Sequence, residues 1–151
     1  MKTQGGFLMS QIKQIGGRVF EQMLRDYGIS EFNGAQGKIL YVLWEFHELP
    51  ITRISKLTSL AKTTLTSMID RMEEKRLVRR RHNPDNRREV LVSITTEAQR
   101  LKEDYEAVSA QINEAYYRGF TEQEIAMHEQ YLLRILKNLE ECEGQNRRRK
   151  I

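Results

Sequence analysis

Residues 61–94 combine a helical hydrophobic pattern with a strand pattern, and this change constrains the fold more than any other feature of the sequence. From Lys62 to Lys75 the apolar side chains recur every three or four residues, which predicts an amphipathic helix. After Leu77 they alternate, and Val78–His82 and Glu89–Ile94 suit two strands joined by the turn-forming residues NPDN. The stretch is therefore predicted to be a helix followed directly by a β-hairpin.

Positive charge is concentrated in the same stretch. Between Lys75 and Arg88, seven lysines and arginines stand against one acid, Asp85, which gives this segment a charge of +6 when the whole chain carries only +4. The run Arg147–Lys150 adds another +4. Subtracting the +6 and the +4 from the total of +4 leaves −6 for the remaining residues. Such segregated charge predicts a polyanionic partner at one surface.

Two further helices are predicted before this stretch. Apolar residues at helical spacing run over residues 7–27, and Gly28 is a typical stop residue. Asn33 and Gln36 have the spacing of a capping box, which opens a helix that is apolar on most faces and is predicted to lie in the core. Trp44 in this helix is interpreted as a packing residue in preference to a ligand contact.

A helix-turn-helix is predicted from the next residues. Pro50 ends the core helix, and Thr52 is placed to cap a short helix with the sequence RISKLTS. A tight turn at Ser59 and Leu60 then leads into the helix that begins at Lys62. Two short helices joined by a turn of a few residues form a helix-turn-helix, and the hairpin that follows adds a wing.

Beyond the hairpin the pattern is helical again, over residues 96–118 and 122–141. Gly119 is the stop signal between these helices, and Thr121 with Glu124 predicts a second capping box. Together with helix 7–27, they carry more apolar surface than one winged domain can cover. A partner surface is therefore expected, and a symmetric homodimer through these three helices is its commonest form.

Residue usage argues against several other classes of function. The apolar runs stay short of the roughly 18–20 residues that span a bilayer, so no membrane partner is expected. The single cysteine, Cys142, favours a reducing cytoplasm, and its acidic neighbours argue against a redox role. The three histidines lie in unrelated elements, and no catalytic set or glycine-rich phosphate loop is present. Neither an enzyme nor a metal or cofactor site is expected.

Two motifs carry a resemblance to a known family. The segment AKTTLTSMIDRMEEKRLVRR resembles the recognition helix and wing entry of the MarR family of bacterial transcriptional regulators, and PDNRREVLVSITTEA resembles its wing signature. The similarity extends over nearly the whole chain, from Phe7 to Leu139. It implies a homodimeric regulator, more often a repressor, that binds an inverted repeat in double-stranded DNA. It also implies release by a small phenolic or other aromatic effector.

The chain departs from the family pattern at three places. The residues DNRR at 85–88 offer the Asp-x-Arg of the wing in two registers, so either arginine can occupy the wing tip. Arg76 replaces the usual glycine at the exit of the recognition helix, and it must adopt a left-handed conformation or change the exit geometry. Ala61 replaces a common capping serine, so this helix is expected to begin less firmly.

The resemblance and the side-chain chemistry together predict the DNA contacts. Short hydroxyl side chains and a lysine in the first turns of the helix suit the major groove, and arginines at the hairpin tip suit the minor groove. Strand arginines suit phosphates, except Arg80, which points the other way and is expected to pair with Asp70 or Glu74. The predicted DNA-binding residues are Lys62, Thr63, Thr64, Thr66, Ser67, Arg71, Arg79, Arg81, Arg87 and Arg88.

The predicted fold is mainly α with a small β-hairpin wing, a winged helix-turn-helix plus a helical dimerisation region in a single domain, 1–151. Residues 30–95 are assigned to the DNA-binding lobe, 7–28 and 96–142 to the dimerisation lobe, and 143–151 to a basic tail. The tail is expected to be disordered, with an accessory DNA contact as the alternative. The aromatic candidates for the effector site are Phe20, Tyr27, Trp44, Tyr105 and Tyr116. A non-specific architectural DNA-binding protein and a protein-binding winged-helix module are the alternative functions.

Overall fold

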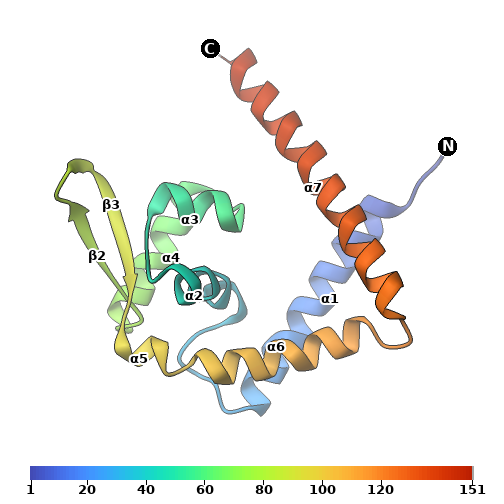
Figure 1. The fold of residues 1–151 in the computed structure, drawn as a ribbon, viewed down its shortest axis with the longest axis horizontal. Coiled ribbons are helices and arrows are strands. Elements are labelled where there is room, and N and C mark those ends of the chain that lie inside the picture. Colours follow the sequence, from blue (N-terminus) through green and yellow to red (C-terminus); the bar gives the residue numbers. More distant parts are fainter. Residues whose placement is uncertain (151) are drawn as a thin grey trace. The chain divides into compact units, whose positions relative to one another are not determined.

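The computed structural model describes residues 1–150 and confirms a mainly helical chain with a small antiparallel sheet (Figure 1). The chain forms two compact units, one of residues 1–112 and one that begins at Asn113. The elements are α1 (Gly5–Asp26), α2 (Gly34–Phe46), β1 (Glu48–Pro50), α3 (Ile51–Thr58), α4 (Lys62–Glu74), β2 (Val78–Asn83), β3 (Asn86–Ile94), α5 (Thr96–Gln99), α6 (Lys102–Tyr116) and α7 (Glu122–Arg149).

The core of the first unit is built around α2, as the sequence predicts. Its capping box is complete: the Asn33 side chain accepts from the Gln36 backbone N–H at 2.8 Å, and the Gln36 side chain accepts from the Asn33 N–H at 3.2 Å. The Trp44 ring is buried, and its Nε1 donates to the carbonyl oxygen of Ala98 at 3.0 Å, which confirms its packing role. The buried cluster joins residues of α2 to Ile54 of α3 and to others from α4 and the sheet.

The helix-turn-helix is present, although its first helix begins differently from the prediction. Pro50, with φ −61° and ψ 145°, stands at the N-cap of α3, and Thr52 already lies inside the helix. The expected cap at Thr52 is therefore wrong, because the extended backbone of proline positions the first turn without a side-chain cap. Ser59 makes the turn into α4 with a left-handed φ of 58°.

The sheet has the strand order β1-β3-β2, with both pairs antiparallel. The predicted hairpin is confirmed, and it is longer than expected because β2 reaches Asn83 and β3 begins at Asn86. Strand β1 was not predicted, since three residues are too few to show a period of two. Its Glu48 lies opposite Ser93 of β3, so β1 borders the wing on the side away from β2.

The helix predicted over residues 96–118 is divided in two. A turn with an i→i−3 hydrogen bond follows α5, in which the Leu101 N–H donates to the Ala98 carbonyl oxygen at 3.1 Å. Helix α6 then begins at Lys102. The Thr95 side chain caps α5 by accepting from the Ala98 N–H at 3.2 Å. Thr95 Oγ1 also lies 2.7 Å from the carbonyl oxygen of Arg76, so this cap is joined to the exit of α4.

The second unit consists mainly of α7. The predicted capping box is confirmed, with Thr121 accepting from the Glu124 N–H at 3.2 Å and Glu124 accepting from the Thr121 N–H at 2.7 Å. The expectation of a disordered tail from residue 143 is wrong as far as Arg149, because α7 continues to that residue; residue 151 lies outside the described part. An ion pair between Glu143 and Arg147 and a basic last turn both favour this extension.

None of the 28 residues of α7 is buried within its own chain, although many are large and apolar. The exposed hydrophobic residues of α7 are Met127, Tyr131, Leu132, Leu133, Ile135, Leu136 and Leu139. In the part of the chain that the structure describes, the helices are all too short or too polar to cross a membrane.

Candidate nucleic-acid interface

Helix α4 presents a polar face whose residues are all exposed. Its opposite side is formed by Leu65, Ile69 and Met72, each fully buried against the core. The 13-residue helix is therefore amphipathic, with one face packed against the core and the other exposed to solvent. The six predicted contact residues on the solvent side are Lys62, Thr63, Thr64, Thr66, Ser67 and Arg71.

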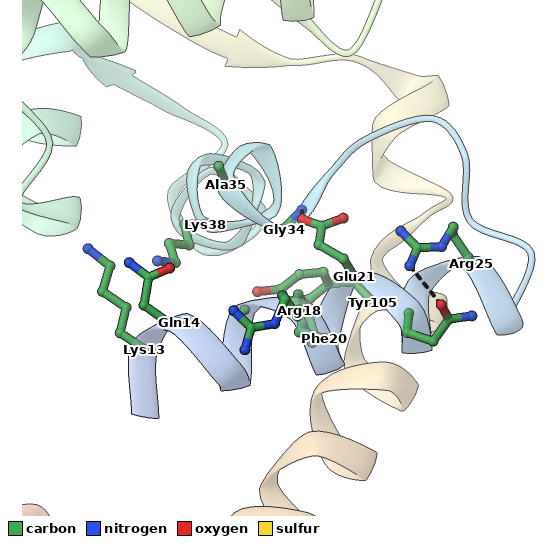
Figure 2. A pocket seen from close by; sticks show the side chains of 12 residues that line it. Lys13, Gln14, Arg18, Phe20, Glu21, Arg25, Gly34, Ala35, Lys38 and Tyr105 are labelled. Atoms are coloured by element: carbon green, nitrogen blue, oxygen red, sulfur yellow. Dashed lines mark hydrogen bonds between the residues drawn. The ribbon is translucent and has the colours of Figure 1, made fainter. Parts of the chain in front are cut away.

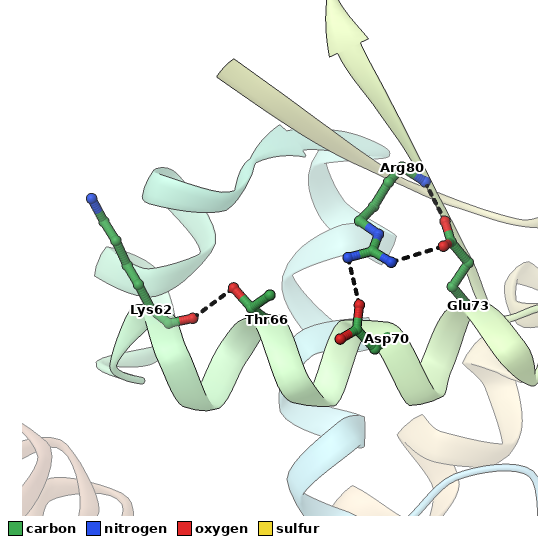
Figure 3. Close-up of polar contacts among 5 residues, drawn as sticks. All are labelled: Lys62, Thr66, Asp70, Glu73 and Arg80. Carbon is green, nitrogen blue, oxygen red and sulfur yellow. Dashed lines mark hydrogen bonds and ion pairs between the residues drawn. The ribbon is translucent and has the colours of Figure 1, made fainter. Parts of the chain in front are cut away.

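The start of α4 is capped weakly, as the sequence predicts. Ala61 has an extended backbone, φ −62° and ψ 144°, and no side chain accepts a hydrogen bond there. The Thr66 hydroxyl donates to the carbonyl of Lys62 at 2.8 Å (Figure 3). Its proton is therefore engaged within the helix, while its oxygen can still accept a hydrogen bond from a partner.

The exit from α4 is a left-handed residue that is not glycine. Arg76 has φ 60°, a conformation that costs a non-glycine residue about 1 kcal/mol. Two backbone bonds hold it there: Arg76 N–H to the Glu73 carbonyl at 3.0 Å and Leu77 N–H to the Met72 carbonyl at 2.9 Å. These bonds are the Schellman pattern, and the apolar contact that often accompanies it is available between buried Leu77 and Met72. Arg76 therefore adopts the glycine conformation and does not change the exit.

Arg80 forms a clamp between the wing and α4 (Figure 3). Its Nη1 lies 2.6 Å from Asp70 Oδ1 and its Nη2 3.0 Å from Glu73 Oε1, while its backbone N–H donates to Glu73 Oε2 at 2.9 Å. The predicted pairing with Asp70 is confirmed, but the second partner is Glu73 and not Glu74. Glu73 and Glu74 lie on either side of Asp70 around the helix, and β2 approaches on the Glu73 side, where the Arg80 backbone N–H also reaches the Glu73 carboxylate. We call Asp70, Glu73 and Arg80 the wing clamp.

The wing clamp alters the acid–base properties of its members. Hydrogen bonding to the Arg80 side chain, with a further bond from its backbone, lowers the pKa of Glu73 below the ordinary value of 4.5. The same bond to Glu73, aided by Asp70, raises the pKa of Arg80. Arg80 is therefore paired within the protein, in agreement with the prediction that set it apart from the arginines expected to contact DNA.

Arg79 and Arg81 lie on the other side of β2, opposite Ser93 and Leu91 of β3, but only one of them is unpaired. Arg81 makes a two-pronged contact with Glu48, with Nε to Oε2 at 3.0 Å and Nη2 to Oε1 at 2.7 Å. This bond lowers the pKa of Glu48 and raises that of Arg81. Arg79 is exposed and makes no ion pair with any described residue. Sequence analysis missed Glu48 because β1 was not predicted.

The wing tip is an ordered turn with two exposed arginines. Asn83 and Asn86 hold the backbone, since Asn83 Oδ1 accepts from the Asp85 N–H at 3.0 Å and Asn86 Oδ1 from the Arg88 N–H at 3.2 Å. Arg87 and Arg88 are both exposed, and neither forms an ion pair within residues 1–150. Arg87 and Arg88 therefore both lack an acidic partner among residues 1–150, whichever of them is taken as the arginine of the Asp-x-Arg pattern.

A pocket of about 760 Å³ opens in the first unit between α1, α2 and Tyr105 (Figure 2). Phe20 and Tyr105 line it edge to face, with ring centroids 6.0 Å apart. Of the five aromatic candidates from the sequence, these two reach the pocket, whereas Tyr27, Trp44 and Tyr116 do not line it. Four cationic side chains also line the pocket, namely those of Lys13, Arg18, Arg25 and Lys38.

Comparison with known proteins identifies the class to which this architecture belongs. A sequence model of the MarR family matches residues 32–90. The HTH-type transcriptional regulator YsmB of Bacillus subtilis (strain 168), itself uncharacterised, is 30% identical over 126 residues, which span 82% of this chain and 80% of that protein. The HTH-type transcriptional repressor MdtR of the same organism is 27% identical over 132 residues, 87% of this chain and 85% of that protein.

Solved structures give the same result. A mutant of MarR from E. coli, complexed with operator DNA, superimposes with a TM-score of 0.77 at 26% identity, covering 87% of this chain and 92% of that chain. Bordetella bronchiseptica BpsR, described with 6-hydroxynicotinic acid as regulator of its DNA binding, superimposes with a TM-score of 0.76 at 27% identity, covering 89% and 99%. The chain belongs to the MarR family and is a winged-helix DNA-binding transcriptional regulator, not an enzyme.

Proposed function

We propose that this protein is a homodimeric repressor that binds an inverted-repeat operator and releases it when a small effector binds. The observation that carries the DNA-binding part is the exposed polar face of α4 together with a wing tip whose two arginines form no ion pair within residues 1–150. A helix with short side chains in its first turns fits the major groove, and exposed arginines at a hairpin tip fit the narrower minor groove.

The proposed contacts divide by chemistry. The hydroxyls of Thr63, Thr64, Thr66 and Ser67 and the side chains of Lys62 and Arg71 face the major groove, and Arg87 and Arg88 the minor groove. Arg79 is a direct phosphate contact. Arg81 contacts a phosphate only after its ion pair with the Glu48 carboxylate is broken. DNA binding would therefore fall steeply with salt concentration, as multiple phosphate contacts require.

Apolar surface supports the homodimer. Helix α1 exposes Phe7 at 68%, Ile12 at 54% and Ile15 at 53%, and α7 separately exposes a longer apolar face. Surfaces of this kind on a monomer mark an interaction site, and a two-fold dimer is the commonest closed arrangement. Two subunits related by such an axis place two recognition helices about one DNA turn apart, which matches an inverted repeat.

The pocket and the relatives support repression that is relieved by an effector. MdtR and YetL of Bacillus subtilis are named as repressors, and the BpsR structure describes regulation of DNA binding by 6-hydroxynicotinic acid. In this chain, aromatic and cationic side chains share a pocket next to α2. An aromatic acid is therefore the proposed class of effector, because its ring and its charge both find complementary groups.

Footprinting on the DNA upstream of the protein's own gene tests this function. We expect protection of two half-sites related by a dyad, and a fall in transcription from that promoter when the purified protein is added. Binding with no sequence preference that disappears at moderate salt would contradict the proposal and favour an architectural protein. Activation of transcription would contradict the repressor assignment while leaving the operator intact.

A further inference from the structure

Glu21 joins the helical arm α1 to the first turn of α2 inside the pocket (Figure 2). Its Oε1 accepts a hydrogen bond from the Gly34 backbone N–H at 2.6 Å, across 13 residues of sequence. The first turn of a helix carries free N–H groups and a partial positive charge, so a carboxylate is favoured at this point. Residues of α2 belong to the same buried cluster as Ile54 of α3 and Leu65 of α4, so this contact connects α1 to the helix-turn-helix through packed side chains.

The close approach depends on glycine at position 34. A Cβ added to Gly34 would lie 2.8 Å from Glu21 Oε1 and 3.1 Å from Phe20 Cδ1. The first distance is shorter than real Cβ contacts, and the flexible Glu21 carboxylate is the group that would move. Gly34 has no left-handed φ among the described backbone, so alanine there would disturb the contact without straining the helix.

Charge in the pocket is unbalanced. Among the residues that the structure describes, Glu21 is the only carboxylate that lines it, against the four cationic side chains. Lys13, Arg18 and Lys38 form no ion pair with any residue between 1 and 150, and the Arg25 Nη2 donates to the neutral amide oxygen of Gln22 at 2.7 Å. A pocket with surplus positive charge attracts an organic anion, and Glu21 is the one internal anion that already occupies part of it.

We propose that the Glu21–Gly34 contact is a latch that an aromatic carboxylate opens. The inference rests on the proposed effector function and specifies its regulation. An anion held by the lysines and arginines over Phe20 and Tyr105 repels the Glu21 carboxylate and takes up the volume next to it. Glu21 leaves the Gly34 N–H, α1 is released from the start of α2, and the helix-turn-helix loses the arrangement that binds the operator.

Reciprocity between coupled sites sets the sign of the test. In this proposal the protein binds DNA better when the Glu21–Gly34 hydrogen bond is formed, and it binds the anion better when that bond is broken. Removing the bond must therefore weaken operator binding and strengthen anion binding together. The two variants are Glu21→Ala, which removes the carboxylate, and Gly34→Ala, which displaces it and keeps its charge. Asp26→Ala is the control, because Asp26 is an exposed acid of α1 that contacts only Gln22 in its hydrogen bonding and does not line the pocket.

The measurements use full-length protein, the operator duplex identified by footprinting, and benzoate with its neutral analogue benzamide. We expect both latch variants to bind the operator about 5-fold or more weakly, and to bind benzoate more tightly by a similar factor in calorimetry. Benzamide binding should change little, and Asp26→Ala should behave as wild type in both assays. Benzoate should lower the operator affinity of wild type more than that of either variant.

Three results would overturn the latch. One is a pair of variants with a lower melting temperature and wild-type affinities, which would make Glu21 a helix cap only. Another is an equal benzoate effect on operator binding in wild type and variants. The third is the absence of benzoate binding to wild type and to Glu21→Ala. Failure of the regulator function itself is seen separately, in a wild-type protein that does not distinguish its upstream DNA from a scrambled duplex.

Discussion

The arginines at the base of the wing and those at its tip carry the same charge but have different surroundings. At the base, Arg80 is held by two carboxylates of α4 and Arg81 by Glu48 of β1. At the tip, Arg87 and Arg88 are exposed and free of ion pairs within the described chain. The comparison shows that a count of basic residues overstates the charge available to DNA, since part of it is neutralised inside the protein.

The two regions also differ in what they contribute to binding. A base that is tied to α4 keeps the hairpin in one orientation relative to the recognition helix, so less conformational freedom is lost when DNA binds. A tip with free arginines supplies charge where a groove can accept it. We therefore propose that the base positions the wing and that the tip contacts DNA, and the following variants test this division.

The largest effect is expected from removing the tip. We expect Arg87→Ala/Arg88→Ala to raise the operator Kd by about 10- to 100-fold, because two side chains that enter a groove are lost. The melting temperature should stay unchanged, since neither arginine forms an ion pair with a residue that the structure describes. Fluorescence anisotropy and thermal unfolding give the two values.

The control for the tip variant removes two equal charges elsewhere. Arg148 and Arg149 lie in the exposed last turn of α7, so Arg148→Ala/Arg149→Ala lowers the net charge by the same amount. If both variants lose the same affinity for the operator and for a scrambled duplex, net charge explains both results, and the assignment to the wing tip is wrong.

A smaller effect on DNA, combined with a loss of stability, is expected at the base. Arg80→Ala removes the wing clamp and should lower the free energy of unfolding by about 1 kcal/mol, the upper end for partly exposed ion pairs. It should also weaken operator binding several-fold, because two carboxylates of α4 then face DNA without a partner. Denaturant unfolding and anisotropy measure both.

Neutralising those carboxylates separates the two causes. In the triple variant Asp70→Asn/Glu73→Gln/Arg80→Ala the repulsion is absent, so operator affinity should recover in part while stability does not. A different outcome would be informative: if Arg80→Ala leaves stability unchanged and reduces the salt dependence of binding, Arg80 is a phosphate contact and the base is not distinct from the tip.

The stability of the clamp should depend on pH in a defined direction. The folded-state pKa of Glu73 lies below its ordinary value of 4.5, so its contribution is complete above about pH 4.5 and is lost as the pH falls through the lowered pKa. The difference in unfolding free energy between wild type and Arg80→Ala should therefore be larger at pH 7 than at pH 3. A difference that does not change between these pH values would show that the carboxylate of Glu73 is not what Arg80 stabilises.

The smallest expected effect is a gain in affinity. Glu48→Gln frees Arg81 from its charged partner, and we expect the operator Kd to fall by up to about 3-fold at low salt, as one added phosphate contact would give at most. Glu45→Gln serves as the control, because Glu45 is an exposed acid nearby that makes no ion pair with any described residue. Weaker binding by Glu48→Gln would mean that Glu48 positions Arg81 for DNA.

Much of the fold could be predicted because its signals are local. Capping boxes at Asn33 and Thr121, the change of period after Leu77 and the left-handed exit at Arg76 each involve residues within a few positions of one another. Hydrophobic spacing and backbone preference act over this range, so they can be read from the chain itself. The family resemblance and the exposed face of α4 follow from the same short-range information.

The partners of individual charges were decided by tertiary structure. Arg81 meets Glu48 from 33 positions away, because a strand too short to predict lies across β3. Glu21 reaches Gly34 because α1 passes over the start of α2. A sequence alone determines which residues are charged and which helix or strand carries them. Which charges are neutralised and which remain for DNA or an effector depends on distances that exist only after the elements pack.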